Sequence, residues 1–307
     1  MSTNLVSFSE LPASEELVML VGWRQWADAG SISSGLPEYL IERTGARKIG
    51  VIEPTNFYLF QIPGTHHLVR PTVILEDGHQ KSLEKRRNEF FFSGDESRGI
   101  VIFLGDEPHL NIDLYAEAFF EAIKTLGVKR VIGMAGVYGP APHFRDRDIG
   151  VIYSLPHLRD ELADYAVRFS DYEGGASIGS YLIGSAEEQG VEFIVYYAFV
   201  PVYDFGKSSL TNQTISIEND YKAWYDVMRR INYMLQLNID LADLEERSNK
   251  LIAFLDDKID DLENERPQLR PRQYVERLDL EFNENPFTPL DDVWERELRD
   301  IFDDLDE

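Results

Sequence analysis

Basic side chains gather in the stretch GVYGPAPHFRDRDIGVI, residues 136–152, in a chain whose net charge is −25. His143, Arg145 and Arg147 lie there between two apolar, strand-like segments. Arginine binds carboxylates and phosphates through two parallel hydrogen bonds, and ligands of α/β proteins gather at strand ends. Two aspartates alternate with the arginines, however, so an intramolecular salt-bridge site is favoured over an anion-binding site.

Other polar residues also fall near the ends of predicted strands. Asp28 follows the first strand, in the loop GWRQWADAG, and most simply caps the next helix. Glu53 and Glu107 could serve as acid/base groups, although a solvated loop carboxylate is the default interpretation. Convergence at one cleft would indicate an enzyme acting on a small anionic or nucleoside-like substrate, of the hydrolase or phosphorylase type. The residues that would have to converge are Trp23, Arg24, Asp28, Glu53, His143 and Arg145.

Known catalytic and cofactor motifs are incomplete in this sequence. GASIG, residues 175–179, matches the Gly-x-Ser-x-Gly nucleophile elbow, but all six histidines precede Ser177, whereas α/β-hydrolases place the histidine after the serine. We therefore expect Ser177 to cap a helix. GMAGVYG, residues 133–139, lacks the glycine spacing of a phosphate-binding loop and indicates tight turning. No metal-binding motif and no cysteine occur, so we predict no catalytic residue, no cofactor and no metal ion.

The candidate residues are positioned by an alternation of helical and strand-like segments. Three amphipathic stretches end at Gly45, Gly127 and Gly190, and an apolar, β-branched run begins within two residues of each. Glycine closes helices in a left-handed conformation, and nearly continuous apolar runs are typical of strands buried on both faces. This pattern predicts an α/β sandwich with a largely parallel sheet, in which residues 68–76 and 147–154 are extra strands that make the sheet mixed.

The C-terminal third has a different character. Residues 217–265 lack glycine and proline and carry apolar residues at helical spacing, which predicts two long helices divided near LNID, with Asp240 as a candidate N-cap. From Asp240 to Glu307 there are 23 acidic and 9 basic residues, a net charge of −14. The first helix should pack on the sandwich and the second on the first or on a neighbouring subunit. The expected parts are an α/β domain over 1–216, helices over 217–265, and a looser acidic tail over 266–307 with short helices at 272–280 and 291–302.

Composition narrows the possible partners. The longest nearly apolar runs fall short of the ~20 residues that cross a bilayer, and the amino terminus lacks the features of a secretory signal. The absence of cysteine fits the cytoplasm. Fifty-five acidic residues against 30 basic ones would repel nucleic-acid phosphates and anionic lipids, so we predict neither nucleic acid nor membrane as a partner.

Four motifs together resemble the PAC2 family, which is named after a eukaryotic proteasome assembly chaperone. They are LVMLVGWRQWADAGSISSGLPEYL, VRP at residues 69–71, GVYGPAPHFR before a new strand, and ASIGSYLIGSAEEQGVEFIVYYAFVPVY, and they span residues 17–203. The C-terminal helices also resemble those of bacterial members. Two loops depart from the family: PHFRD, residues 142–146, stands where the bacterial pattern is Pro-His-Thr-Arg-Pro, and RQWA lengthens the loop before Asp28.

The resemblance implies a three-layer α/β/α sandwich like that of purine nucleoside phosphorylases, followed by a C-terminal helical appendage. It implies self-association or docking of a protein partner more than chemistry. A non-catalytic binding or assembly protein with a chaperone-like role, forming a homo-oligomer, is therefore the leading hypothesis, and the enzyme is the alternative. Arg70 of the VRP motif and Tyr203 at the end of the last motif join the candidate residues of a strand-end cleft or interface.

Overall fold

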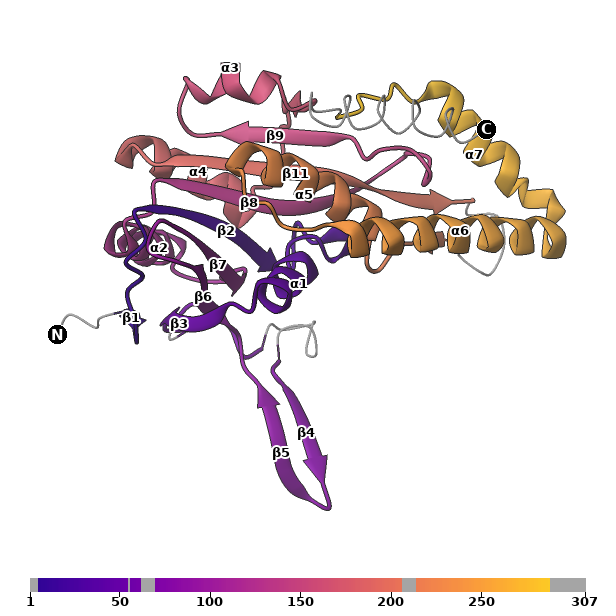
Figure 1. The fold of residues 1–307 in the computed structure, drawn as a ribbon. Helices are drawn as coiled ribbons and strands as arrows, with labels where there is room; N and C mark the ends of the chain where they lie inside the picture. The colour runs from indigo at the N-terminus through magenta and orange to yellow at the C-terminus, as the bar shows by residue number, and fades with distance from the viewer. Residues whose placement is uncertain (1–4, 55, 62–69, 206–213, 288–307) are drawn as a thin grey trace, which may run out of the picture.

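A ten-stranded sheet runs through the protein (Figure 1). The computed structural model describes residues 5–54, 56–61, 70–205 and 214–287. Along the sheet the strand order is β1-β3-β6-β7-β2-β8-β11-β9-β10, and β12 pairs with β11. The strands are β1 (Val6–Phe8), β2 (Glu16–Arg24), β3 (Arg47–Ile52), β6 (Asn88–Gly94), β7 (Arg98–Asp106), β8 (Arg130–Gly139), β9 (Ile149–Tyr153), β10 (Arg168–Phe169), β11 (Glu192–Asp204) and β12 (Thr214–Ser216).

The centre of this sheet is parallel and its flanks are mixed. β7, β2, β8 and β11 are parallel neighbours. β6 and β9 add antiparallel to the two sides of that centre, and β1 pairs antiparallel with β3. The predicted strand at 147–154 is thus confirmed as β9, and the sheet is mixed and mostly parallel, as expected.

Helices cover both faces of the sheet and make three layers. Side chains alternate between the faces along each strand, so Val131 contributes to one core cluster and Ile132 to the other. α2 (Ile112–Leu126) and α4 (Ile178–Gln189) pack on the first face. α1 (Gly35–Thr44), which follows the 3-10 turn η1 (Ala29–Ser31), packs on the second with α3 (Leu158–Ala163) and α5 (Tyr221–Leu235).

Glycines close the helices that precede buried strands. Gly45, Gly127 and Gly190 have left-handed backbones with φ of 62°, 74° and 67°, which confirms the predicted helix ends. The expectation of tight turning at residues 133–139 is wrong, because these residues lie within the continuous strand β8. A Cβ at Gly136 would lie 2.1 Å from the carbonyl oxygen of Ala29, so close approach of two backbones requires glycine there.

A separate hairpin leaves the body between β3 and β6. It consists of β4 (Thr72–Glu76) and β5 (His79–Glu84), which pair only with each other among the described residues. Residues 70–76 of the predicted strand at 68–76 lie at this hairpin, whereas residues 68 and 69 lie outside the described residues. The prediction that this strand joins the main sheet is therefore wrong.

Three α-helices end the described part of the chain, and the last two extend beyond the ends of the strands (Figure 1). α5 belongs to the core, because Val227, Met228 and Ile231 are all 0% exposed against the sheet. α6 (Ala242–Glu265) packs on α5, and α7 (Pro271–Glu281) follows after the turn η2 (Pro267–Leu269). Asp240 lies one residue before the N-cap position, although its Oδ1 accepts from the amide of Ala242 at 3.0 Å.

Two sequence expectations concern the rest of the chain. The short helix predicted at 272–280 is confirmed within α7, and the one predicted at 291–302 lies outside the described residues. In the described part of the chain, no helix has both the length and the apolar character that a membrane span requires.

Candidate functional site

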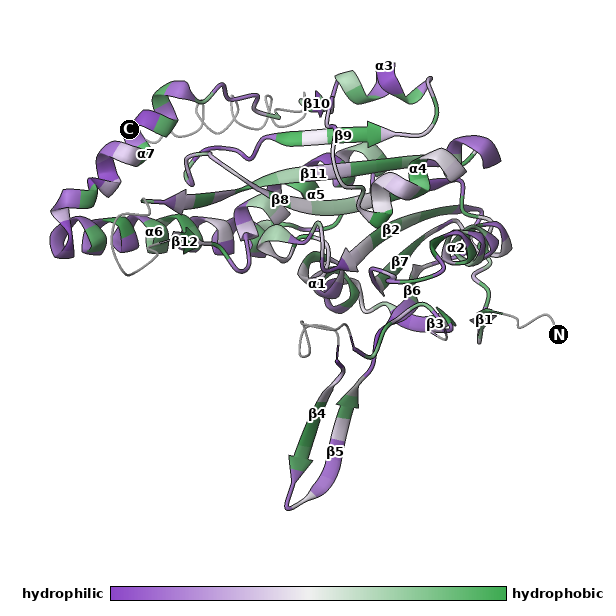
Figure 2. Cartoon of the chain, turned by 180° about the vertical axis from the view of Figure 1, so that it is seen from behind, coloured by the Kyte–Doolittle hydropathy of each residue, from purple (hydrophilic) through white to green (hydrophobic). Residues whose placement is uncertain are grey.

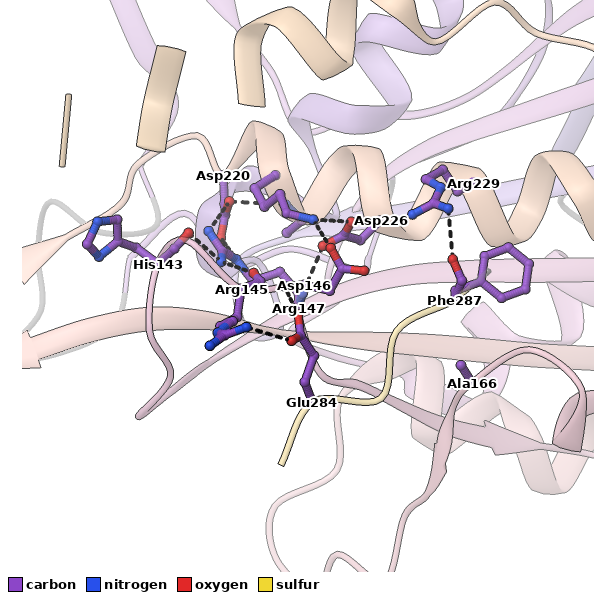
Figure 3. A network of polar contacts seen from close by, with 12 residues as sticks. His143, Arg145, Asp146, Arg147, Ala166, Asp220, Asp226, Arg229, Glu284 and Phe287 are labelled. Carbon is purple, nitrogen blue, oxygen red and sulfur yellow. Dashed lines mark hydrogen bonds and ion pairs between the residues drawn. The ribbon is translucent and has the colours of Figure 1, made fainter. Parts of the chain in front are cut away.

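The loop between β8 and β9 is bound to the C-terminal helices, and we call residues 140–148 the clasp loop (Figure 3). Its central contact is the pair of Arg147 and Asp220, whose side chains are both 0% exposed. Arg147 donates from Nε to Oδ2 of Asp220 at 2.8 Å and from Nη2 to Oδ1 at 3.1 Å. Asp220 is also the N-cap of α5, where its Oδ1 accepts from the amide of Ala223 at 3.1 Å. The carboxylate of Asp220 therefore caps the first turn of α5 and also balances the positive charge of Arg147 in the clasp loop.

Arg147 also shapes the clasp loop from within. Its Nη1 donates to the carbonyls of His143 and Arg145 at 2.9 and 3.0 Å. Its own amide donates to Oδ2 of Asp226 on α5 at 2.8 Å. Burial disfavours the charged guanidinium, but the attraction and hydrogen bonding of Asp220, together with the attraction of Asp226 and Tyr203, outweigh that cost and raise the pKa of Arg147. The guanidinium is therefore engaged by the protein itself and is not presented to a ligand.

Two further cations on α5 complete the buried network. Lys222 contacts the carboxylates of Asp146 and Asp226, and its Nζ lies 2.5 Å from Oδ1 of Asp226. Arg230 donates to the carbonyls of Tyr165 and Asp226 at 2.9 and 2.8 Å. Burial raises the pKa of Asp226, and the attraction of Lys222 opposes that rise. With the Arg147–Asp220 pair, the network balances three cations against three carboxylates, the condition under which charge is tolerated away from water.

His143 connects the clasp loop to both β11 and α6. Its ring is 1% exposed, with Nδ1 at 2.9 Å from the hydroxyl of Tyr203 and Nε2 at 2.9 Å from Oδ1 of Asp256. Burial lowers the pKa of His143, and the carboxylate of Asp256 opposes that change. Tyr203 is itself buried at the end of β11, and burial raises its pKa. The buried imidazole of His143 therefore connects the clasp loop to β11 and to α6.

Arg145 reaches the last described segment. Its Nε donates to Oδ1 of Asp279 on α7 at 2.8 Å, and its Nη1 donates to Oε2 of Glu284 at 3.1 Å. This side chain is 42% exposed, unlike Arg147. The three basic residues of the clasp loop thus bind three different partners: Arg147 binds α5, His143 binds α6, and Arg145 binds α7 and the segment after it. The favoured interpretation of this loop, an intramolecular salt-bridge site, agrees with these contacts.

Trp23 and Arg24, at the end of β2, also have partners within the chain. Trp23 is 5% exposed, and its Nε1 donates to the hydroxyl of Tyr115 at 2.8 Å. Its ring packs among core phenylalanines, so it is a core residue. Arg24 forms an ion pair of 2.6 Å with Glu38 on α1. Neither side chain points a polar group into a shared cleft with the clasp loop.

Asp28 organises the turn that leads into α1. Its Oδ1 accepts from the amides of Ser33 and Ser34, both at 2.9 Å, and its Oδ2 accepts from the hydroxyl of Ser34 at 2.8 Å. Burial raises the pKa of Asp28, and these hydrogen bonds oppose the rise. The carboxylate performs the capping role expected for it, although it reaches the helix start from beyond the 3-10 turn.

Glu107 holds two loops together at the ends of the parallel strands. Its Oε1 accepts from the amide of Ile178 at 2.7 Å, and its Oε2 accepts from the amide of Trp26 at 3.2 Å. Burial raises the pKa of Glu107, and the two amides oppose the rise. This carboxylate is therefore a half-buried acceptor for backbone groups rather than a fully solvated loop residue.

Ser177 is the N-cap of α4, as expected from the sequence. Its Oγ accepts from the amide of Ser180 at 3.3 Å and lies 2.9 Å from the hydroxyl of Tyr197. The cavity that Ser177 and Tyr197 line with Glu107 measures about 10 Å³, which leaves room for no more than about one water molecule. A nucleophilic serine would need access for its substrate, and this space offers none.

The last two candidates lie elsewhere. Glu53 is exposed just after β3, and its amide donates to the carbonyl of Leu5 at 2.8 Å. Arg70 stands at the base of the β4–β5 hairpin, where it donates to Oε1 of Gln61 at 2.6 Å and covers the ring of Phe60. Of the eight candidates, His143 and Tyr203 share a hydrogen bond. Arg24 and Asp28 both bind residues at or just before α1. Trp23, Glu53, Arg70 and Arg145 have their described partners elsewhere in the fold. The structure does not bring the set together.

The sequence analysis did not identify the charged residues of α5 that form the buried network with the clasp loop. Lys222, Asp226 and Arg230 are each less than 10% exposed, and they recur every fourth residue on one stripe of the helix. A signal for them exists in the sequence, because three charged residues at this spacing flank the apolar positions that predict burial. A polar cavity of about 240 Å³ lies beside this stripe and is lined by both acidic and basic side chains, including Lys222, Arg229 and Glu245. None of the eight candidates lines it.

Comparisons with known proteins agree with this architecture. The model of the PAC2 family matches residues 23–257. A proteasome-assembly chaperone homologue of Mycobacterium tuberculosis is 19% identical, with a TM-score of 0.67 over 78% of this chain and 94% of that one. A PAC2 family protein from Streptomyces avermitilis is 22% identical, with a TM-score of 0.67 over 81% and 99%. PbaB of Pyrococcus furiosus, an archaeal proteasome activator, is 20% identical, with a TM-score of 0.56 over 82% and 97%. No curated protein matches.

Proposed function

The chain belongs to the PAC2 family, and from this premise we propose that it is a non-catalytic assembly protein that acts by binding other protein chains. The family and the similarity to proteins described as a proteasome-assembly chaperone homologue and a proteasome activator support a chaperone-like role. Self-association and the docking of a further protein partner are the two activities that such a role needs. The missing cysteines favour the cytoplasm as the place where it works.

One observation carries this proposal: the polar groups at the strand ends are engaged within the chain. Arg147 and His143 are at most 1% exposed and bind C-terminal helices, and Asp28 and Glu107 accept backbone amides. An active site needs groups that face a substrate from one concave wall. Polar groups that already form hydrogen bonds with one another stabilise the fold instead. A rigid fold of this kind can present a binding surface to another protein.

The enzyme alternative has less support. It required six residues to converge at one cleft, and their contacts include α1, the core and the C-terminal helices. The balanced charges around the polar cavity beside α5 do not single out an anionic ligand, because carboxylates line it together with cations. We therefore regard binding as the primary activity.

A mixing experiment with a proteasome core particle from the same organism tests the proposal. We expect the purified protein to co-migrate with the particle or its precursors in native gels and to change the rate at which precursors mature. The control is the same protein heated until it has lost its fold. Turnover of nucleosides or esters by the purified protein, abolished by Ser177→Ala, would overturn the non-catalytic assignment. Failure to bind any proteasome species would remove the proteasome as the partner.

A further inference from the structure

The polar cavity beside α5 is large enough to hold a ligand. Its volume is about 240 Å³, and one water molecule takes up about 30 Å³ in the liquid, so the cavity has room for several waters or for one small organic molecule. Its wall is formed by α5, α6, Asp146 of the clasp loop, and Pro286 and Phe287 after α7. Four separate parts of the chain therefore border one space.

The two helices that border this cavity each present a polar stripe to it. The residues of these stripes are Lys222, Tyr225 and Arg229 on α5 and Glu245, Ser248 and Asn249 on α6. Residues three or four apart lie on one face of a helix. Elsewhere both helices contribute apolar side chains to one core cluster, including Ile231, Leu244 and Leu255. Figure 2 shows that hydrophobic and hydrophilic residues alternate along α6, so its buried face changes from apolar packing to a polar space at the cavity.

Two buried polar groups in the cavity wall have unused hydrogen-bonding capacity. The side chain of Lys222 is 9% exposed, and its ammonium contacts the carboxylates of Asp146 and Asp226. An ammonium has three N–H donors, so these two contacts leave one for a ligand. Ser248 is 2% exposed, and its hydroxyl has no hydrogen-bond partner among the residues that the structure describes. A buried hydroxyl is destabilising without a partner, and a ligand oxygen in the cavity supplies one.

The charges around the cavity favour a ligand that carries both signs. Lys222 and Arg229 provide two cations, and Asp146 and Glu245 provide two carboxylates. An anion would lie beside both carboxylates, and a cation would lie beside both cations. A zwitterion pairs with groups of each sign, and because it is neutral it is not repelled by a chain whose net charge is −25. The wall therefore favours a small zwitterion over a phosphate or a polyamine.

We propose that the polar cavity beside α5 binds a free amino acid. The α-carboxylate of the ligand accepts hydrogen bonds from the ammonium of Lys222 and the hydroxyl of Ser248, and its α-ammonium lies against the carboxylate of Glu245. Glu245 and Ser248 are three residues apart on α6, so their Cβ atoms lie about 5–6 Å apart, which suits the two charged ends of one amino acid. This site goes beyond the proposed function. Its occupant joins α5, α6 and the clasp loop, and it should therefore stabilise the C-terminal part of the fold.

Thermal unfolding of the full chain tests the proposal. The probes are the protein amino acids, each added singly at millimolar concentration. At least one should raise Tm by about 5 °C or more once its concentration is about 100-fold above its Kd. Isothermal titration calorimetry then measures that Kd. The N-acetylated derivative of the same amino acid lacks the ammonium, and its amide lacks the carboxylate, so both should bind at least about tenfold more weakly.

Ser248→Ala locates the ligand within the protein. Because the hydroxyl has no partner among the described residues, the variant should keep the wild-type Tm without ligand. It should raise the Kd of the amino acid by about tenfold, since a hydrogen bond to a charged group is lost. Ser185→Ala, on α4 and outside the cavity wall, is the matched control and should change neither quantity. Glu245→Gln should also raise the Kd, and by a smaller factor at high salt, because Glu245 is exposed.

The outcomes separate this inference from the proposed function. If no amino acid raises Tm or gives heat on titration, the ligand site is overturned and the assembly function still stands. Binding that Ser248→Ala leaves unchanged overturns the assignment to this cavity. Equal affinity for the N-acetylated derivative or for the amide overturns the requirement for both charges and indicates the end of a peptide chain instead. An amino acid that binds as expected to a protein that ignores every proteasome species supports the site and counts against the proposed function alone.

Discussion

The clasp loop and the arm, which is the β4–β5 hairpin of residues 71–85, are both connections that leave the main sheet. They differ in which side chains they bury: the clasp loop buries charged groups, and the arm exposes apolar ones. The clasp loop is rich in charge, and the side chains of its Arg147 and of Asp220, the N-cap of α5, are both 0% exposed. The arm is rich in apolar residues, and its Leu75 is 60% exposed. Charged groups buried with partners and apolar groups exposed without them both run against the usual distribution of side chains. Residue type alone would suggest a ligand site in the clasp loop and a buried strand in the arm, and the contacts of the described residues support neither.

The contrast shows where binding should be sought in this fold. Residue types that could do chemistry sit in the clasp loop, but each of its basic groups has an intramolecular partner. The arm contains few such residues, and its contacts remain to be made. A surface is available for function when its interactions are incomplete, whatever the reactivity of its side chains. The following changes test this difference, from the largest expected effect to the smallest.

Removal of residues 240–307 should have the largest effect. It deletes α6, whose Leu244 and Leu255 are at most 2% exposed in the core cluster that includes α5. Loss of a buried leucine costs about 2–5 kcal/mol, so the truncated protein should lose about 4 kcal/mol or more of its free energy of unfolding. The clasp loop also loses the carboxylates that bind His143 and Arg145. Urea denaturation followed by circular dichroism measures the change.

Two outcomes would contradict this expectation for the truncated protein. Unchanged stability would mean that the clasp contributes nothing to the sandwich, and complete unfolding would mean that the sandwich does not fold without α6. The matched comparison is Leu75→Thr on the arm, which should leave the free energy of unfolding within about 0.5 kcal/mol of the wild type. Its apolar side chain is already exposed, so the folded chain loses little packing.

Arg147→Ala should have the next largest effect. It leaves the carboxylate of Asp220 buried at 0% exposure without its cation. Breaking a buried ion pair by removal of one partner costs about 3–5 kcal/mol. We expect this loss in the free energy of unfolding, measured by urea titration. A loss under about 1 kcal/mol would show that water reaches the pair and that the clasp is not a buried network.

The fold could be predicted from the sequence because the sequence signals for its helices and strands are local. Gly45, Gly127 and Gly190 mark helix ends through their own backbone preference, and the apolar runs after them read as buried strands. The alternation of arginine and aspartate in the clasp loop also indicated salt bridges. The partner of Arg147, however, is Asp220, and the partner of His143 on α6 is Asp256. No local pattern assigns a partner that far along the chain.

The arm was misplaced for a related reason. A short apolar run has the same pattern whether it lies in a buried sheet or on an exposed hairpin, since periodicity reports the strand and not its neighbours. Residues 72–76 were therefore expected in the main sheet, whereas the structure pairs them with β5 alone. The charged stripe of Lys222, Asp226 and Arg230 was overlooked because charged helix positions are ordinarily solvated.

His143→Gln should produce a smaller effect that depends on pH. Burial holds the pKa of His143 below its ordinary value of 6.5, so the unfolded chain takes up a proton before the folded chain does as the pH falls. Wild-type stability should therefore decrease as the pH falls below about 6.5, at no more than about 1.4 kcal/mol per pH unit from this group. Glutamine removes this contribution. Denaturation between pH 7.5 and 5.5 compares the two slopes.

Identical pH dependence in the two proteins would show that His143 titrates in the folded state as it does when unfolded, and hence that the ring is open to water. Among the described residues, His109 is the other histidine whose pKa burial lowers, and it is present in both proteins and cancels in the comparison. The arm variant Ile74→Thr should follow the wild-type slope, because it leaves every titrating group unchanged.

Arg145→Ala should have the smallest effect, and it isolates burial as the cause of the difference within the clasp loop. Arg145 and Arg147 lie two residues apart and each binds carboxylates, but the side chain of Arg145 is 42% exposed and that of Arg147 is 0% exposed. Exposed ion pairs gain little, because water solvates the separated charges almost as well and salt screens what remains. The urea midpoint of Arg145→Ala should therefore lie close to that of the wild type, and any difference should disappear at high salt. Arg147→Ala should keep its full loss under the same conditions, because salt does not reach a buried pair. The two variants could instead lose equal free energy of unfolding and respond equally to salt. In that case the clasp loop stabilises the fold through the number of its charges rather than through their burial, and its contrast with the apolar arm is one of composition.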